Sequence, residues 1–84
     1  MQSVDLDELY LYCRVDTQEQ KLLVVQLAES CEAALLSKGI PFNGNTALRF
    51  GLTVKAMTLH EMDHPGEALP QGIREKINDL KFNH

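Results

Sequence analysis

The side chains best suited to chemistry lie in one short segment, His60-Glu61-Met62-Asp63-His64, which spells H-E-x-x-H. On a helix this spacing places two imidazoles on one face, where they can hold zinc, with a glutamate beside them that can activate the metal-bound water. The chemistry would be hydrolysis by a minimal zinc enzyme. No other cluster in the sequence offers catalysis.

The surrounding sequence argues against a zinc site. His64 directly precedes Pro65, whose ring disfavours helical geometry at the preceding residue, so the second histidine sits where a helix ends. The candidates for a third ligand, Glu67, Glu75 and His84, stand at no recognised zincin spacing. A histidine in the last turn of a helix also interacts favourably with the helix dipole. The sequence therefore predicts no catalytic residue, no metal ligand and no cofactor.

The composition is typical of one small globular domain. The 84 residues are 44% hydrophobic and 24% charged, and no repeat or low-complexity tract divides them. We expect a single domain over residues 1–84, whose small core favours association with further copies. The longest aliphatic run, residues 22–25, is far shorter than the roughly 20 residues that cross a bilayer. No signal peptide opens the chain, so the sequence predicts an intracellular soluble protein.

Charge is distributed unevenly along the chain, whose formal net charge is -4. Residues 1–32 carry seven acids and two bases, whereas residues 33–84 carry five acids and six bases. An acidic face argues against a surface that wraps DNA, because neutralising phosphates requires clustered Lys and Arg. Cys13 and Cys31 lack the C-x-x-C spacing, so buried reduced thiols are the expected state.

Two capping boxes near the N-terminus predict a helical hairpin. In each, an aspartate at the N-cap is followed three residues later by a glutamate, as in Asp5/Glu8 and Asp16/Glu19. The first helix would span residues 6–13, and the second residues 17–38, where Gly39 would end it. The expected core positions are Leu6, Leu9, Tyr10 and Cys13 on the first helix, and Leu23, Val24, Leu27, Ala28, Cys31, Ala34 and Leu35 on the second.

An irregular segment separates this hairpin from a second pair of helices. Residues 39–45 contain a proline and an Asn-Gly turn signal, which predict a loop or a small hairpin. Asn45 or Thr46 would cap a third helix that ends near Asp63, and Pro70 would open a fourth helix at its first position. The predicted fold is all-α: a four-helix domain with long second and third helices and short first and fourth helices.

A leucine stripe is expected to form the core face of the third helix. Its members are Leu48, Leu52, Ala56 and Leu59, flanked by Phe50, Val54, Met57 and Met62. Gly51 costs about 1 kcal/mol relative to alanine within a helix and indicates that another backbone approaches closely. We expect the second helix to cross there.

Segments near the two ends of the chain suggest a family. Asp5-Leu6-Asp7-Glu8-Leu9 leads into Tyr12-Cys13-Arg14-Val15-Asp16, and Leu69-Pro70-Gln71-Gly72-Ile73-Arg74 opens the last helix. This pattern resembles the head-tail connector (adaptor) proteins of tailed bacteriophages, also called DNA-packaging or head-completion proteins. The similarity spans about residues 4–82. The sequence departs from the family pattern at Cys13, where an aliphatic residue is usual, and in its last five residues.

The resemblance implies a structural and non-enzymatic function. Such proteins form a ring beneath the portal after DNA packaging and provide the surface to which stopper or tail proteins attach. The partners would be further copies of the chain, the portal protein and a stopper or tail-completion protein, in the neck of a virion assembled in the host cytoplasm. DNA would pass through the ring without specific binding, and no membrane would take part.

Two segments are candidates for contacts with these partners. The amphipathic fourth helix is too short to be stable alone and would dock on a neighbour. The loop before the third helix would expose Phe42 at its tip. The residues assigned to these contacts are Phe42, Asn43, Leu69, Pro70, Ile73, Arg74, Ile77 and Leu80. The alternative for both segments is packing within the chain.

Two other functions compete with the adaptor. A small helical DNA-binding or regulatory protein is the alternative, because the short connection at residues 14–16 would suit a helix-turn-helix motif. The helix after this connection is, however, too long and too acidic for a recognition helix. A zinc hydrolase that uses His60 and His64 as ligands is the function that the sequence favours least.

Overall fold

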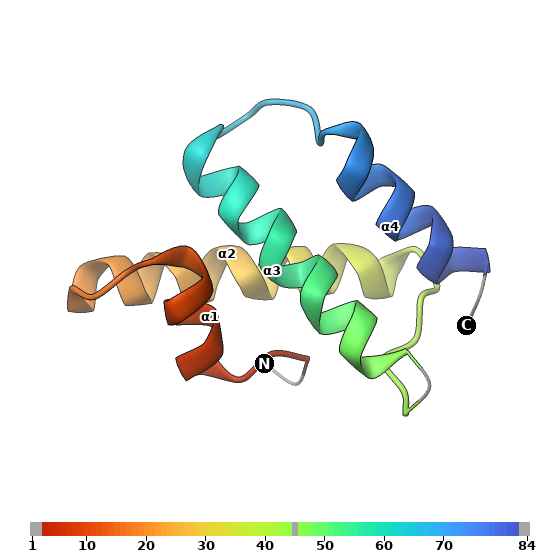
Figure 1. The fold of residues 1–84 in the computed structure, drawn as a ribbon, viewed down its shortest axis with the longest axis horizontal. Helices are drawn as coiled ribbons and strands as arrows, with labels where there is room; N and C mark the ends of the chain where they lie inside the picture. Colours follow the sequence, from red (N-terminus) through yellow and green to blue (C-terminus); the bar gives the residue numbers. More distant parts are fainter. Residues whose placement is uncertain (1–2, 45, 83–84) are drawn as a thin grey trace.

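A computed structural model describes residues 3–44 and 46–82, and four helices make up most of these ranges (Figure 1). The helices are α1 (Leu6–Cys13), α2 (Gln18–Ser37), α3 (Ala47–Asp63) and α4 (Gln71–Phe82). The described ranges contain no strand, so the predicted all-α class is confirmed and residues 39–44 form a loop without a hairpin. Within the same ranges, no helix is both long and apolar enough to cross a membrane.

The helix starts agree with the capping signals to within one residue. The carboxylate of Asp5 accepts a hydrogen bond from the amide three residues later, at 3.2 Å, as predicted. The cap of α2 is Thr17 and not Asp16, and its hydroxyl accepts from the amide three residues later, also at 3.2 Å. α4 begins at Gln71, so Pro70 immediately precedes the helix.

α3 is the central helix of the domain. It packs against α1, α2 and α4, most extensively against α2, which passes behind it in Figure 1. α1 and α4 lie on opposite sides of it. The buried residues of α3 are Phe50, Gly51, Thr53, Val54, Ala56, Met57 and Thr58. Three of them, Phe50, Val54 and Met57, share a core with residues from every other helix, including Leu9, Val24, Leu35, Ile77 and Leu80.

The buried face of α3 differs from the predicted leucine stripe. Leu48 and Leu52 are 78% and 41% exposed, whereas Thr53 and Thr58 are buried. Burial of these hydroxyls is possible because each donates to the carbonyl four residues earlier in α3, at 2.8 Å and 2.7 Å. The prediction was therefore wrong for these two leucines. The other predicted core leucines that the structure leaves exposed are Leu6 and Leu23.

α2 ends in a Schellman motif. The amide of Gly39 donates to the carbonyl of Leu36 at 3.0 Å, and the amide of Ile40 donates to the carbonyl of Leu35 at 3.3 Å. Gly39 has a φ of +82°, which glycine adopts without steric cost. Leu35 and Ile40 are both fully buried, so the motif also directs the chain into the core.

α1 ends in the same motif with an arginine in place of the glycine. The amide of Arg14 donates to the carbonyl of Leu11 at 3.3 Å, and the amide of Val15 donates to the carbonyl of Tyr10 at 3.1 Å. Val15 is buried, and Tyr10 packs against the same core. Arg14 has a φ of 57° and is the one non-glycine residue with a positive φ in the described ranges. A side chain in this conformation costs about 1 kcal/mol.

The close approach at Gly51 involves the N-terminal segment, and the predicted crossing by the second helix was wrong. A Cβ atom on Gly51 would lie 2.6 Å from the carbonyl oxygen of Ser3. Ser3 is in turn held by Glu32 of α2, whose Oε2 accepts hydrogen bonds from the Ser3 amide, at 2.9 Å, and from the Ser3 hydroxyl. The next residue, Val4, is buried in the core. Glycine therefore lets the segment cross α3.

Replacing Arg14 with glycine should raise the free energy of unfolding by about 0.5–1 kcal/mol, because the steric cost of the left-handed conformation disappears. Urea denaturation followed by circular dichroism measures the change. The matched substitution Gly39→Ala at the end of α2 should lower the free energy of unfolding by about 1 kcal/mol. A less stable Arg14→Gly chain would contradict this account of the α1 terminus.

Replacing Gly51 with alanine should lower the free energy of unfolding by about 1–3 kcal/mol, because the backbone of Ser3 has to move. The helix propensity of alanine alone would give a gain of about 1 kcal/mol, so the sign of the change is informative. In a chain lacking residues 2–4, the same substitution should be stabilising. Urea denaturation of four chains tests this: the full chain and the chain lacking residues 2–4, each with and without Gly51→Ala. A higher free energy of unfolding for Gly51→Ala in both the full and the shortened chain would show that nothing opposes the Cβ atom.

Candidate functional site

The H-E-x-x-H segment forms the end of α3 and the turn that follows it. His60 is helical, whereas His64 ends the helix with φ -137° and ψ 62°, outside the helical region that the following proline disfavours. The two imidazole rings stack, with their centroids 5.4 Å apart. His64 Nδ1 lies 2.7 Å from Oε2 of Glu67, and the carboxylate of Glu61 accepts from the amide of Gly66 at 3.4 Å. These side chains stabilise the turn.

A zinc site needs at least three protein ligands, whether catalytic or structural. Over residues 3–44 and 46–82, no group of three His, Cys, Asp or Glu residues could hold a metal ion. Among the third-ligand candidates, Glu67 contacts His64, and Glu75 accepts a hydrogen bond from Gln71 of its own helix at 3.2 Å. His84 lies outside the described residues.

The two thiols are free and lie within the helical packing. Burial, with the negative charge of Asp63, raises the pKa of the Cys13 thiol above its ordinary value of 9.0. Burial and the charge of Glu61 also raise the pKa of the half-buried Cys31 thiol, although a hydrogen bond with Thr58 acts in the opposite direction. A nucleophilic cysteine needs a lowered pKa, so neither environment favours thiolate chemistry.

α4 docks on α3 of the same chain. Four apolar residues of the predicted partner contact pack against the domain's own core: Leu69, Ile73, Ile77 and Leu80. Ile77 and Leu80 are only 8% and 1% exposed, so a partner cannot reach them on the folded chain. Packing within the chain is thus the alternative that the structure supports for this helix. Pro70 and Arg74 remain exposed.

The loop before α3 also folds inward. Phe42 was predicted at an exposed tip, but it is half-buried and its ring meets the Phe50 ring edge-on, with the centroids 5.5 Å apart. Thr46 is fully buried at the end of the loop, where its hydroxyl donates to the carbonyl of Pro41 at 3.2 Å. Asn43 remains exposed. The exposed-tip prediction was wrong because packing on Phe50 shields part of the Phe42 ring from water.

The described surface carries several large apolar side chains that the core leaves exposed. They are Leu6, Leu11, Tyr12, Leu22, Leu23, Leu36, Leu48, Leu52 and Phe82. Single exposed hydrophobic residues are ordinary, whereas apolar side chains gathered at a hollow with a polar rim mark interaction sites. Leu11 and Leu52 each line such a hollow.

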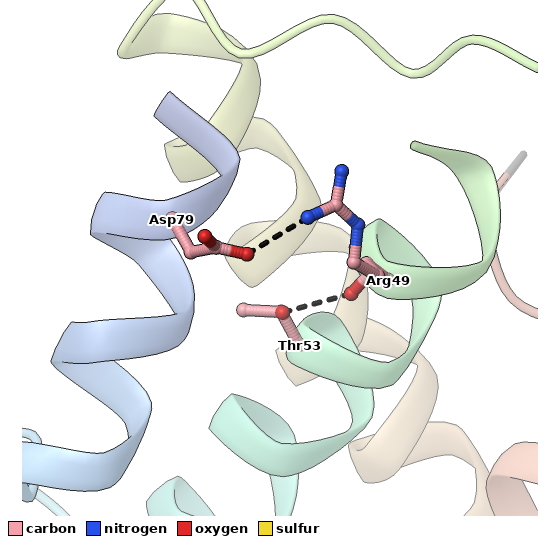
Figure 2. A network of polar contacts seen from close by, with 3 residues as sticks. All are labelled: Arg49, Thr53 and Asp79. Carbon is pink, nitrogen blue, oxygen red and sulfur yellow. Dashed lines mark hydrogen bonds and ion pairs between the residues drawn. The ribbon is translucent and has the colours of Figure 1, made fainter. Parts of the chain in front are cut away.

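The first hollow, the basic groove, lies between α3 and α4 and has a volume of about 210 Å³. Its lining residues are Arg49, Leu52, Thr53, Lys76, Asp79 and Leu80. Figure 2 shows that Arg49 reaches across to Asp79 of α4, with 2.8 Å between the charged groups. Both side chains are about half-exposed, so the pair adds little stability, although it links α3 to α4 across the groove. With Lys76, the lining carries two bases and one acid.

The second hollow, the acidic hollow, lies where α1 turns into α2 and has a volume of about 330 Å³. Its lining residues are Asp7, Tyr10, Leu11, Val15, Asp16 and Lys21. Leu11 is 79% exposed, and Lys21 Nζ lies 5.2 Å from the centroid of the Tyr10 ring. The lining carries two acids and one base, the reverse of the basic groove.

Sequence reasoning did not predict either hollow. The helical period could have indicated that Leu11 is exposed at the acidic hollow. Leu11 stands two residues from the buried Leu9, so it faces the opposite side of α1. Leu48 and Leu52 gave no such signal, since they form an apolar stripe that could equally face inward. Comparison with known protein families, curated proteins and solved structures finds no match to this chain.

The raised thiol pKa values predict a loss of stability in alkaline solution. In the unfolded chain a thiol ionises near pH 9.0, whereas in the folded chain it stays protonated to higher pH, so the free energy of unfolding falls as the pH rises through this window. A chain with Cys13→Ala and Cys31→Ala should lose less stability between about pH 8 and pH 10. Urea denaturation at both pH values measures the difference; equal losses in the two chains would refute it.

Proposed function

We propose that this chain is a structural head-tail adaptor of a tailed phage or prophage. It would form a ring under the portal after DNA packaging and provide the attachment surface for stopper or tail-completion proteins.

The observation that carries the proposal is how the two family-like segments combine buried and exposed residues. In the first, Val15 is buried in the core while the neighbouring Arg14 and Asp16 are exposed. In the second, Ile73 packs against the core while Arg74 is exposed. Folding accounts for the apolar residues, and Arg74 Nε also donates a hydrogen bond to the carbonyl of Leu69 at 3.1 Å. The exposed charges of Arg14 and Asp16, and the rest of the Arg74 guanidinium, fit a role in contacts with partners.

The backbone of Arg14 supports the same interpretation. This residue keeps a left-handed conformation that glycine would adopt at lower cost, and its side chain is exposed. Unfavourable backbone conformations persist where function requires the residue. The arginine of the family-like turn is therefore a candidate contact with a partner protein.

The charge balance also fits a subunit that lines a DNA passage. With a formal net charge of -4, the chain carries more acids than bases, which disfavours a tight grip on the phosphates of moving DNA. The helix-turn-helix alternative fits less well, because α2, which follows the 14–16 turn, has 20 residues with three glutamates and one lysine. Such a helix would be repelled from the major groove.

Assembly with a portal ring tests the proposal. The purified chain is mixed with the portal ring of the same phage or prophage, and light scattering with particle imaging measures the mass and shape of the product. We expect the chain to add density to one end of the ring and to raise its mass in steps of 9.5 kDa.

Arg14→Ala and Arg74→Ala should weaken this addition, whereas Lys38→Ala, a matched loss of an exposed base outside both segments, should not. A folded chain that never joins the portal, even at high concentration, would overturn the proposal. Tight binding to duplex DNA in the same assay would instead support the regulatory alternative.

A further inference from the structure

The basic groove and the acidic hollow lie toward opposite ends of the molecule. The domain measures 37 × 27 × 18 Å, and in Figure 1 the turn from α1 to α2 forms the left end of the longest dimension while α4 lies at the right. Two different surfaces at opposite ends suit a contact in which one end of a copy meets the other end of the next. Such head-to-tail contacts repeat from copy to copy and form a ring when the rotation between copies closes, or an open filament when it does not.

Apolar side chains remain exposed at both the acidic hollow and the basic-groove end of the folded chain. Leu11 is 79% exposed at the acidic hollow. Leu52 lines the basic groove, and Leu48, one helical turn earlier on the same stripe of α3, is 78% exposed. Phe82, at the end of α4, is 76% exposed. These side chains can be removed from water when the two ends meet.

The charges around the two ends are complementary. The residues that line the acidic hollow carry two acids, Asp7 and Asp16, and one base, Lys21, which leaves an excess negative charge. The residues that line the basic groove carry two bases and one acid; Arg49 and Asp79 pair with each other, so Lys76 supplies the excess positive charge. Pairing either end with itself would bring like charges together, whereas pairing the two different ends brings opposite charges together.

We propose that a second copy of this chain occupies each hollow, with the acidic hollow of one copy docked on the basic groove and the Leu48/Leu52 stripe of the next. This rests on the proposed function, since it names the contact between copies that a ring requires. Apolar side chains supply the centre of the contact, and the charges of Asp7, Asp16 and Lys76 select the head-to-tail arrangement over a symmetric dimer.

Mixing two variants, each with one of the two docking surfaces disrupted, tests this arrangement. Leu11→Arg places a positive charge in the acidic hollow and leaves the other end intact; Leu48→Glu places a negative charge on the opposite end. Both residues are highly exposed, so both variants should fold, and circular dichroism checks this. Lys76→Glu serves in place of Leu48→Glu if that chain does not fold.

Sedimentation equilibrium should show that the unchanged chain associates with increasing concentration. Each variant alone should associate more weakly by roughly tenfold or more. An equimolar mixture should recover at least a dimer, because the intact groove of the Leu11→Arg chain can dock on the intact hollow of the Leu48→Glu chain. Leu36→Glu, at an exposed leucine that lines neither hollow, should associate like the unchanged chain.

Raising the salt concentration from about 0.05 M to about 0.5 M should weaken the association, because it screens the complementary charges. A monomeric unchanged chain at all concentrations, a mixture that stays monomeric, or variants that associate like the unchanged chain would overturn the inference. The experiment contains no portal, so failure here is distinguishable from failure to bind the portal.

Discussion

A chain of 84 residues can cover one helix on several sides, and in this domain that helix is α3. Enclosing it requires that three helices and the segment at residues 3–4 all approach closely. Two small residues, Gly51 and Ala56, allow the approach. The hydroxyls of Thr53 and Thr58 donate hydrogen bonds to backbone carbonyls of the same helix. Among the described residues, no buried side-chain nitrogen or oxygen lacks a hydrogen-bond partner. The domain gains a shared core without burying unpaired polar groups.

The motifs that end the helices direct the following residues into this core. The Schellman motifs that end α1 and α2 each place one apolar residue beyond the helix, and Val15 and Ile40 enter the core directly from these turns. The direction in which the chain leaves each helix is thus set by a few backbone hydrogen bonds. This geometry brings α2 back beside α1 and carries the loop after α2 toward the start of α3.

These local signals explain which parts of the fold could be predicted. Caps and prolines act within three or four residues, so Asp5, Gly39 and Pro65 indicated helix limits that the structure reproduces closely. The buried face of α3 could not be predicted in the same way, because apolar residues surround much of this helix. Gly51 indicated a close backbone but not its identity. The basic groove combines α3 with α4, and no local signal joins those segments.

The position of the leucines has a physical consequence for the proposed assembly. Leu52 faces water while its neighbour Thr53 is buried, which is the reverse of the order that hydrophobicity alone would favour. Each leucine left exposed forgoes about 2 kcal/mol of transfer free energy, and the left-handed arginine at residue 14 adds a further cost to the isolated domain. A free-standing domain gains nothing from either feature. In the proposed ring, contact between neighbours would remove Leu11, Leu48 and Leu52 from water, and the transfer free energy of these side chains would then stabilise the assembly.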